Sequence, residues 1–259
     1  MKSLVNYISE RLVINQRFDE KLIINKDYKN TYTCAPKSFD ELREIIEDRY
    51  DKLGPGTKNK PVDFNDVDVS NIDSFYSVNM NMGIFENTKF EYIDISDWNV
   101  SNIMHMSNMF YKCKLLKSVG DLSNWTVSKV KSIISMFSNC KQLKSVGNLS
   151  NWDVSNVENM SSTFWGCEQL TYVGDLSKWN VSKVEDTGDM FYNCVNLTSV
   201  GDLSDWDVSK VRCINNMFRK CEQLTSVGDL SNWNVSKVKY MFNTFKDSGI
   251  TNIPKWYKG

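Results

Sequence analysis

Apolar and aromatic residues return along most of this chain at one fixed interval. Tryptophan and phenylalanine each recur six times at a step of 27 residues. Their positions are Trp98, Trp125, Trp152, Trp179, Trp206 and Trp233, and Phe110, Phe137, Phe164, Phe191, Phe218 and Phe245. Valine, glycine and cysteine recur in the same register. Ladders that share one period indicate a repeat protein, in which each 27-residue repeat, here called a rung, stacks on the next.

The spacing inside a rung predicts two local structures. From Ser128 to Cys140 the apolar residues fall at i, i+3, i+6/i+7 and i+10, which is typical of one helical face, and Ser128 is a suitable N-cap. From Leu143 to Val154 the steps shorten to two, which predicts a short strand between tight bends, with a glycine that supplies positive φ or a close backbone approach. We therefore predict an α/β repeat, a solenoid with one short helix and one short strand per rung and with the aromatic ladders inside.

A different pattern precedes the ladders. Ser38 and Glu41 have capping-box spacing at the start of an amphipathic helix, which Gly54-Pro55 ends. Residues 61–95 echo the rungs without the tryptophan and predict a degenerate first rung that closes the solenoid together with the helix. The expected organisation is an N-terminal segment at 1–35, a capping helix and degenerate repeat at 36–95, and six 27-residue repeats with a short C-terminal cap at 96–259.

The N-terminal segment is amphipathic, with Leu4, Ile8 and Leu12 on or near one face. Three interpretations remain open. The segment folds back on the cap, it docks into a larger assembly, or it lies on a membrane surface, although Lys2 and Arg11 give only a thin basic face for the last of these.

Composition and charge narrow the function. The chain has 31 Lys and Arg against 32 Asp and Glu, a formal net charge of -1, so nothing favours nucleic-acid binding. No stretch has the roughly 18 apolar residues of a membrane span. The N-terminus lacks the apolar core of a signal peptide, and we expect no use of the general secretion route.

Few residues could support catalysis, disulfide formation or metal binding. The single histidine, His105, stands between methionines, so no catalytic set can be argued from it and we expect no enzyme. Of the seven cysteines, five follow the 27-residue step, where packed helices would keep them too far apart for disulfides. No zinc-type spacing occurs, so we expect reduced thiols, no metal and no cofactor.

Asp and Asn form two further ladders, one after the glycine and one after the tryptophan. Such side chains bond nearby backbone amides in turns, which is the simpler interpretation. A calcium or ligand ladder is the alternative, but no EF-hand or similar spacing supports it.

Variation between rungs is confined to certain positions. The residue four places after each tryptophan is Asn102, Lys129, Asn156, Lys183, Lys210 or Lys237. We predict that Lys129, Lys183, Lys210 and Lys237 lie on a solvent-facing helical stripe, which either is only a solvated face or contacts a partner. If it is the contact, charge reversal at Lys183, Lys210 and Lys237 together should weaken binding without loss of stability. The strand side and the N-terminal residues are the alternative contacts.

The string Asp-Leu-Ser-Asn-Trp-Asp/Asn-Val-Ser with a later Met-Phe-x-x-Cys is clearest at 148–167 and 229–245. It resembles the BspA-like leucine-rich-repeat surface proteins, whose 25–27-residue repeat also occurs in mycoplasma lipoproteins. The Pro36–Leu42 helix start and the Asp63–Ser70 segment resemble that family's lead-in, so the likeness spans about 36–250. It implies a leucine-rich-repeat-like solenoid, surface display, and adhesion or protein binding, in host-associated bacteria or their phages.

Two functions follow from these patterns. The first is a non-enzymatic binding or structural module on a virion or cell surface, whose partner is a protein, including other virion or surface proteins. The second is a cytoplasmic scaffold or effector that binds a host protein. A glycan-acting enzyme is the weakest case, because no carboxylate pair can be placed.

Overall fold

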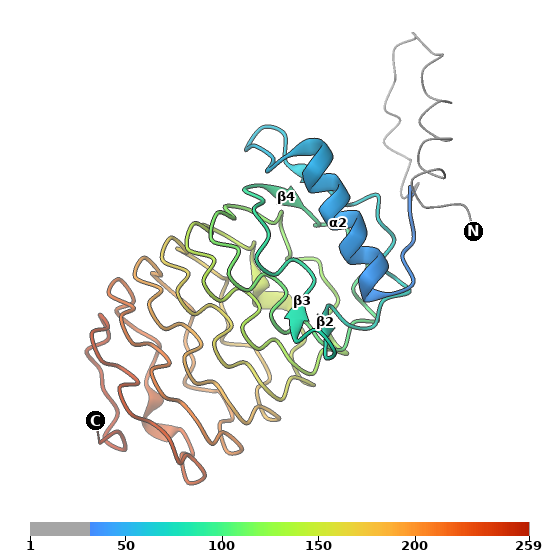
Figure 1. Cartoon of the computed structure of the whole chain (residues 1–259). Coiled ribbons are helices and arrows are strands. Elements are labelled where there is room, and N and C mark those ends of the chain that lie inside the picture. Colours follow the sequence, from blue (N-terminus) through green and yellow to red (C-terminus); the bar gives the residue numbers. More distant parts are fainter. Residues whose placement is uncertain (1–31, 259) are drawn as a thin grey trace, which may run out of the picture. The chain divides into compact units, whose positions relative to one another are not determined.

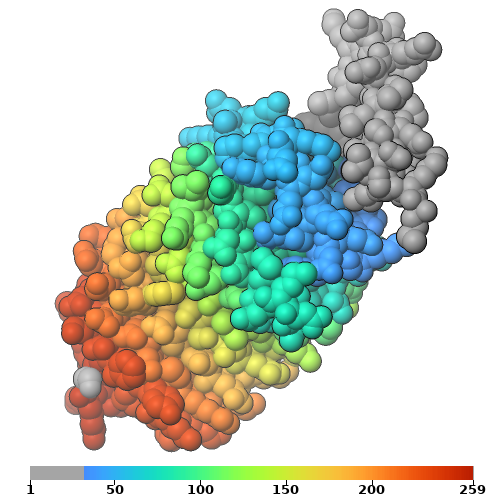
Figure 2. Space-filling view, in the orientation of Figure 1, coloured from blue at the N-terminus to red at the C-terminus, as the bar shows by residue number. Residues whose placement is uncertain are grey.

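The computed structural model describes residues 32–258, which belong to one compact unit. Residues 1–31 and 259 lie outside the described part, and so do the predicted contacts Leu4, Ile8 and Leu12. The described chain winds into a coil of stacked rungs that begins beside a single long helix (Figure 1). In Figure 2 the rungs are successive bands of colour, and each band touches the one before and the one after.

The helix, α2 (Phe39–Leu53), begins and ends where the sequence predicts. The Ser38 side chain accepts a hydrogen bond from the Glu41 amide, and Gly54, at φ 71°, donates its own amide to the Tyr50 carbonyl. The buried side chains are Leu42, Ile45 and Ile46. They join the same apolar cluster as the rungs, so α2 is packed against the coil.

Other regular elements are short. Strands β1 and β4 pair in parallel and β2 and β3 pair antiparallel, and two 3-10 turns follow. Their bounds are β1 Val62–Asp63, β2 Tyr76–Ser77, β3 Met82–Gly83, β4 Ile93–Asp94, η2 Leu149–Asn151 and η3 Leu230–Asn232. The predicted helix in each rung is therefore wrong for the described residues, where α2 is the α-helix, and the predicted strands are reduced to single bridges.

Consecutive β-turns take the place of the predicted rung helix. In one rung the amides of Val130, Met136 and Cys140 each donate to the carbonyl three residues earlier, at 2.9, 3.2 and 3.0 Å. Each turn brings its closing residue back to the core, so apolar side chains recur at a step of three. In an α-helix a step of three falls about 60° short of a full turn, so a sustained three-residue period leaves one face. Over a short segment the step of three fits a helix or successive turns, and the hydrogen bonds show that it is formed by turns here.

The turns that replace the predicted helix need a left-handed backbone at two positions in each rung, besides the positive φ of the ladder glycine. Ser135 and Asn139 have φ of 52° and 61°, and their counterparts one rung later, Ser162 and Gly166, have φ of 56° and 71°. Asn and Gly tolerate this region better than most residues. Asn or Gly therefore occupies many of these positions. The two positions recur from rung to rung and are separate from the Asp and Asn ladders described above.

Backbone hydrogen bonds join each rung to the next. Every second amide from Ile133 to Asn139 donates to a carbonyl of the following rung, at 2.6–3.2 Å. Parallel β-bridges run through the same part of each rung, from Ser74 through His105 to Tyr240. The rungs are thus parallel, and each rung is both donor to and acceptor from its neighbours.

Candidate functional site

The aromatic ladders form the inside of the scaffold. The six ladder tryptophans are 3–5% exposed and the six ladder phenylalanines at most 6%. Neighbouring rings stack, with 5.2 Å between the centroids of Phe110 and Phe137 and 6.3 Å between those of Trp125 and Trp152. Each indole N–H donates to the carbonyl 30 residues earlier, or 34 for the first, as Trp152 does to Leu122 at 2.9 Å. These residues hold the rungs together and are not available to a partner.

The cysteine ladder also has a structural role. Cys140 Sγ donates to the Phe110 carbonyl at 3.1 Å, and Cys167 repeats this contact with Phe137. Burial raises the pKa of both thiols, which keeps the hydrogen on sulfur that this bond requires. The cysteines of the described residues are unpaired.

The Asp and Asn ladders make turns, which agrees with the simpler interpretation. Asp175 Oδ1 accepts the Ser177 amide at 3.0 Å, and hydrogen bonds from Ser177 hold the Asp175 pKa below its usual value. The glycine of the next rung lies directly over this carboxylate, since a Cβ on Gly201 would be 1.9 Å from Asp175 Oδ1. Within residues 32–258 no group of three or more His, Cys, Asp or Glu is placed to hold a metal ion.

Two positions in every rung are mostly polar and exposed, and they recur at the 27-residue step. We call the surface at these positions the variable face and define it by the positions four and six residues after each tryptophan. Its residues are Asn102, Lys129, Asn156, Lys183, Lys210 and Lys237, and Met104, Lys131, Glu158, Glu185, Arg212 and Lys239. Lys129, Lys183, Lys210 and Lys237 are all exposed. They lie on an edge of turns and not on a helical face, which corrects the predicted stripe.

Side chains of this face contact one another from rung to rung. Lys129 Nζ donates to Asn102 Oδ1 at 2.8 Å, and Lys183 Nζ donates to Asn156 Oδ1 at 2.6 Å. Arg212 lies 3.7 Å from the Glu185 carboxylate. The face therefore offers charges of both signs at fixed spacings on a rigid support.

The N-terminal end of the coil is covered by α2. Arg43 donates to the carbonyls of Ile84 and Glu86, at 2.9 and 3.3 Å. In later rungs the equivalent carbonyls accept amides from the preceding rung, as Met136 accepts from Phe110. The guanidinium of Arg43 thus substitutes for the missing rung.

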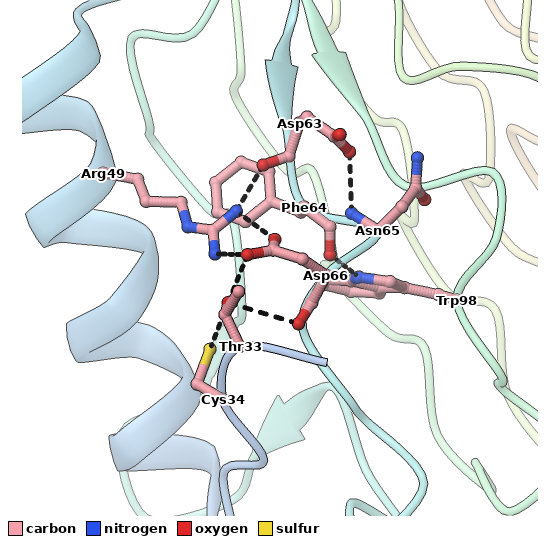
Figure 3. Close-up of polar contacts among 8 residues, drawn as sticks. All are labelled: Thr33, Cys34, Arg49, Asp63, Phe64, Asn65, Asp66 and Trp98. Atoms are coloured by element: carbon pink, nitrogen blue, oxygen red, sulfur yellow. Dashed lines mark hydrogen bonds and ion pairs between the residues drawn. The ribbon is translucent and has the colours of Figure 1, made fainter. Parts of the chain in front are cut away.

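A second arginine of α2, Arg49, bonds to the first rung at Asp63 and Asp66, and Asp66 in turn bonds to Thr33 in the segment before the helix (Figure 3). Arg49 bonds both carboxylate oxygens of Asp66, at 2.6 and 2.9 Å, and also the Asp63 carbonyl. Thr33 donates its hydroxyl to the same carboxylate and its amide to the Asp66 carbonyl. Burial raises the Asp66 pKa, but the bonds from Arg49 and Thr33 outweigh it, and the pKa is lowered.

The C-terminal end is covered only in part. Trp256 stacks on Trp233, with centroids 6.1 Å apart, and donates to the Leu230 carbonyl at 2.7 Å, while Tyr257 packs edge-on against Phe245. This tail closes the aromatic ladders but leaves another part of the last rung uncovered. Tyr240 and Phe242 are 56% and 52% exposed there.

Sequence reasoning missed this uncovered edge, although a signal was available. The positions of Tyr240 and Phe242 hold no Phe, Tyr or Trp in the five preceding rungs. The change from residues that are small or polar, except for Ile134, to two aromatic residues marks the last rung as different.

A shallow pocket of about 230 Å³ lies between α2 and residues 87–90, lined by Arg43, Glu47, Tyr50 and Lys89 among others. Its charges are mixed and include no pair that suggests catalysis. No helix among the described residues is long and apolar enough to span a membrane.

Comparison with known proteins identifies the family of the chain. A family model described as "Mycoplasma protein of unknown function, DUF285" matches residues 78–200 and 171–256. No curated protein sequence matches. A leucine-rich repeat protein from Eubacterium ventriosum ATCC 27560 matches in structure, with a TM-score of 0.42 and 21% identity over 65% of this chain and 40% of that one, so the chain spans less than half of that protein's length. Since the family matches cover more than half of its residues, the chain belongs to the DUF285 family of mycoplasma proteins, in agreement with the BspA-like and mycoplasma-lipoprotein pattern of its repeat.

Proposed function

We propose that the stacked rungs are a non-enzymatic protein-interaction module, displayed on a virion or cell surface, that binds a protein partner through the variable face. The observation that carries this proposal is the division of each rung into two kinds of position. The ladder positions are constant and buried, whereas the positions of the variable face differ from rung to rung and are largely exposed.

Repeat scaffolds suit this role because each rung contacts only its neighbours, so outward residues can change without loss of the core. The variable face presents lysines at a 27-residue step, held by contacts such as that between Lys183 and Asn156. A rigid row of such side chains binds by many polar contacts over a long surface. Family membership supports a repeat protein of this kind but assigns no partner.

The test reverses three charges of the variable face. The variant Lys129→Glu/Lys183→Glu/Lys210→Glu is compared with Lys114→Glu/Lys144→Glu/Lys178→Glu, which makes the same change in net charge at exposed lysines outside the face. The probes are purified native particles and a membrane fraction from the source. We expect the first variant to lose retention on the probe and the second to keep it, with equal thermal stability.

Equal retention of both variants would remove the variable face as the contact. Recovery of the native protein only in the soluble fraction would overturn surface display and favour the cytoplasmic scaffold.

A further inference from the structure

The last rung has backbone donors that no other part of the described chain uses. In earlier rungs the amides at these positions donate to the following rung, as Ile214 does to Tyr240 and Asn216 does to Phe242, at 2.8 and 3.0 Å. The equivalent amides of Met241 and Asn243 have no hydrogen-bond partner within residues 32–258. They come just after the parallel bridge at Tyr240. Asn243 begins a turn with a left-handed backbone at φ 57°, as its counterpart Asn216 does at φ 49° while it donates to Phe242. We call residues 239–243 the open edge.

Large apolar side chains lie on the open edge. Tyr240 and Phe242 are 56% and 52% exposed, and Met241 between them is partly buried against the core. Unpaired amides beside exposed aromatic rings form the surface that strand addition uses, in which main-chain bonds give affinity and side chains give selectivity.

Charge around the open edge is mainly positive. From Leu230 to Lys246 the chain carries Lys237, Lys239 and Lys246 and no Asp or Glu, although the exposed Asp229 and Asp247 lie directly before and after this stretch. The preceding rung adds the exposed Lys210 and Arg212 on the same side. Lysines on an exposed edge commonly prevent aggregation, but here the basic residues continue onto an inner rung, where no edge needs protection.

We propose that the open edge binds an extended, acidic segment of a partner protein, which adds in parallel beside Lys239–Asn243. The amides of Met241 and Asn243 donate to its carbonyls, Tyr240 and Phe242 contact its side chains, and the lysines attract its carboxylates. The inference rests on the proposed function, protein binding, and gives the chemistry of one partner segment.

Two other occupants fit less well. The N-terminal end of a second copy fits less well because three carbonyls of its first rung already have donors: Arg43 bonds those of Ile84 and Glu86, and the Ser74 hydroxyl bonds that of Tyr76. A single-stranded nucleic acid meets the charge and the rings but offers no carbonyls at strand spacing to the amides.

The experiment measures backbone amide exchange by NMR in the full chain, with and without a ten-residue peptide of alternating Thr and Glu. In the free chain Met241 and Asn243 should exchange fast and the equivalent Ile214 and Asn216 slowly. The peptide should slow Met241 and Asn243 by at least roughly tenfold. A matched peptide of alternating Thr and Lys should leave the exchange of both amides unchanged.

Variants at the aromatic pair separate this site from the variable face, because Tyr240 and Phe242 are not part of that face. Tyr240→Ser/Phe242→Ser should weaken peptide binding by roughly tenfold, and Lys237→Glu/Lys239→Glu, at lysines that the two surfaces share, should weaken it by a similar factor. The control Tyr172→Ser, at an exposed tyrosine that lies outside the open edge, should not.

Other outcomes overturn the inference. These are unchanged exchange at Met241 and Asn243, equal binding of both peptides, binding of oligo(dT) in place of the acidic peptide, or slow exchange that depends on chain concentration, which indicates self-association. If Tyr240→Ser/Phe242→Ser still binds native particles while the Lys129/Lys183/Lys210 variant does not, the proposed function stands and this inference fails.

Discussion

At the N-terminal end of the coil, the carbonyls of Ile84 and Glu86 have no preceding rung, and Arg43 donates to both. At the C-terminal end, the amides of Met241 and Asn243 have no following rung, and no described residue accepts from them. The two ends thus lack opposite halves of the rung-to-rung hydrogen bonds: acceptors without a donating rung at one end, and donors without an accepting rung at the other.

The difference shows how a solenoid can be closed at one end and left available at the other. An arginine on a helix supplies several donors at once and so satisfies a row of carbonyls. A row of amides needs acceptors, and the C-terminal tail supplies apolar cover through Trp256 and Tyr257 instead. The N-terminal end is therefore expected to be the more stable one, and the following predictions test that comparison.

Removal of an end tryptophan should give the largest contrast. Trp98 is 3% exposed and packs against Phe64, Phe75 and Phe85, so Trp98→Ala should cost about 3–5 kcal/mol. Trp256 is only half-buried, so Trp256→Ala should cost about 1–2 kcal/mol. Urea unfolding followed by near-ultraviolet circular dichroism measures both, and equal losses would contradict the comparison.

Loss of the arginine cap should have an intermediate effect. Arg43→Met keeps the apolar stem but leaves two carbonyls of buried residues without a donor, so we expect a loss of about 2 kcal/mol in unfolding free energy. The control is Lys52→Met, an exposed residue of α2 that pairs only with Asp48, which should change stability by less than about 0.5 kcal/mol. If both variants unfold at the same urea concentration, Arg43 is not the cap.

The smallest effect should be a pH dependence at the N-terminal end. The Asp66 pKa is lowered below 3.8 in the folded chain, so its contribution is present above the unfolded pKa and is lost as pH falls through the folded pKa. Asp66→Asn should therefore lower stability at pH 7 and reduce the further loss between pH 4 and pH 2. Asp51→Asn, at an exposed position of α2, is the control. Parallel acid unfolding curves for wild type and Asp66→Asn would rule out this role for the Arg49 pair.

The sequence alone determined the repeat. A ladder such as Trp98 to Trp233 can hold its register only if each rung repeats the same packing, so the period, the stacking and the aromatic core follow from spacing. Ser38 and Gly54 likewise fixed the ends of α2, because caps act on backbone groups a few residues away. The turn role of the Asp and Asn ladders is local in the same sense.

Tertiary structure decided what a rung is made of and where the coil is open. Apolar steps of three fit one or two turns of a helix as well as they fit successive β-turns, and only hydrogen bonds to neighbouring rungs, as from Phe137 to Thr163, make the turns the better choice. The open edge at Met241 and Asn243 depends on which residues the tail covers. That is a contact between Trp256 and Trp233, 23 residues apart, and the order of residues does not specify it, because the same tail could lie over either side of the last rung.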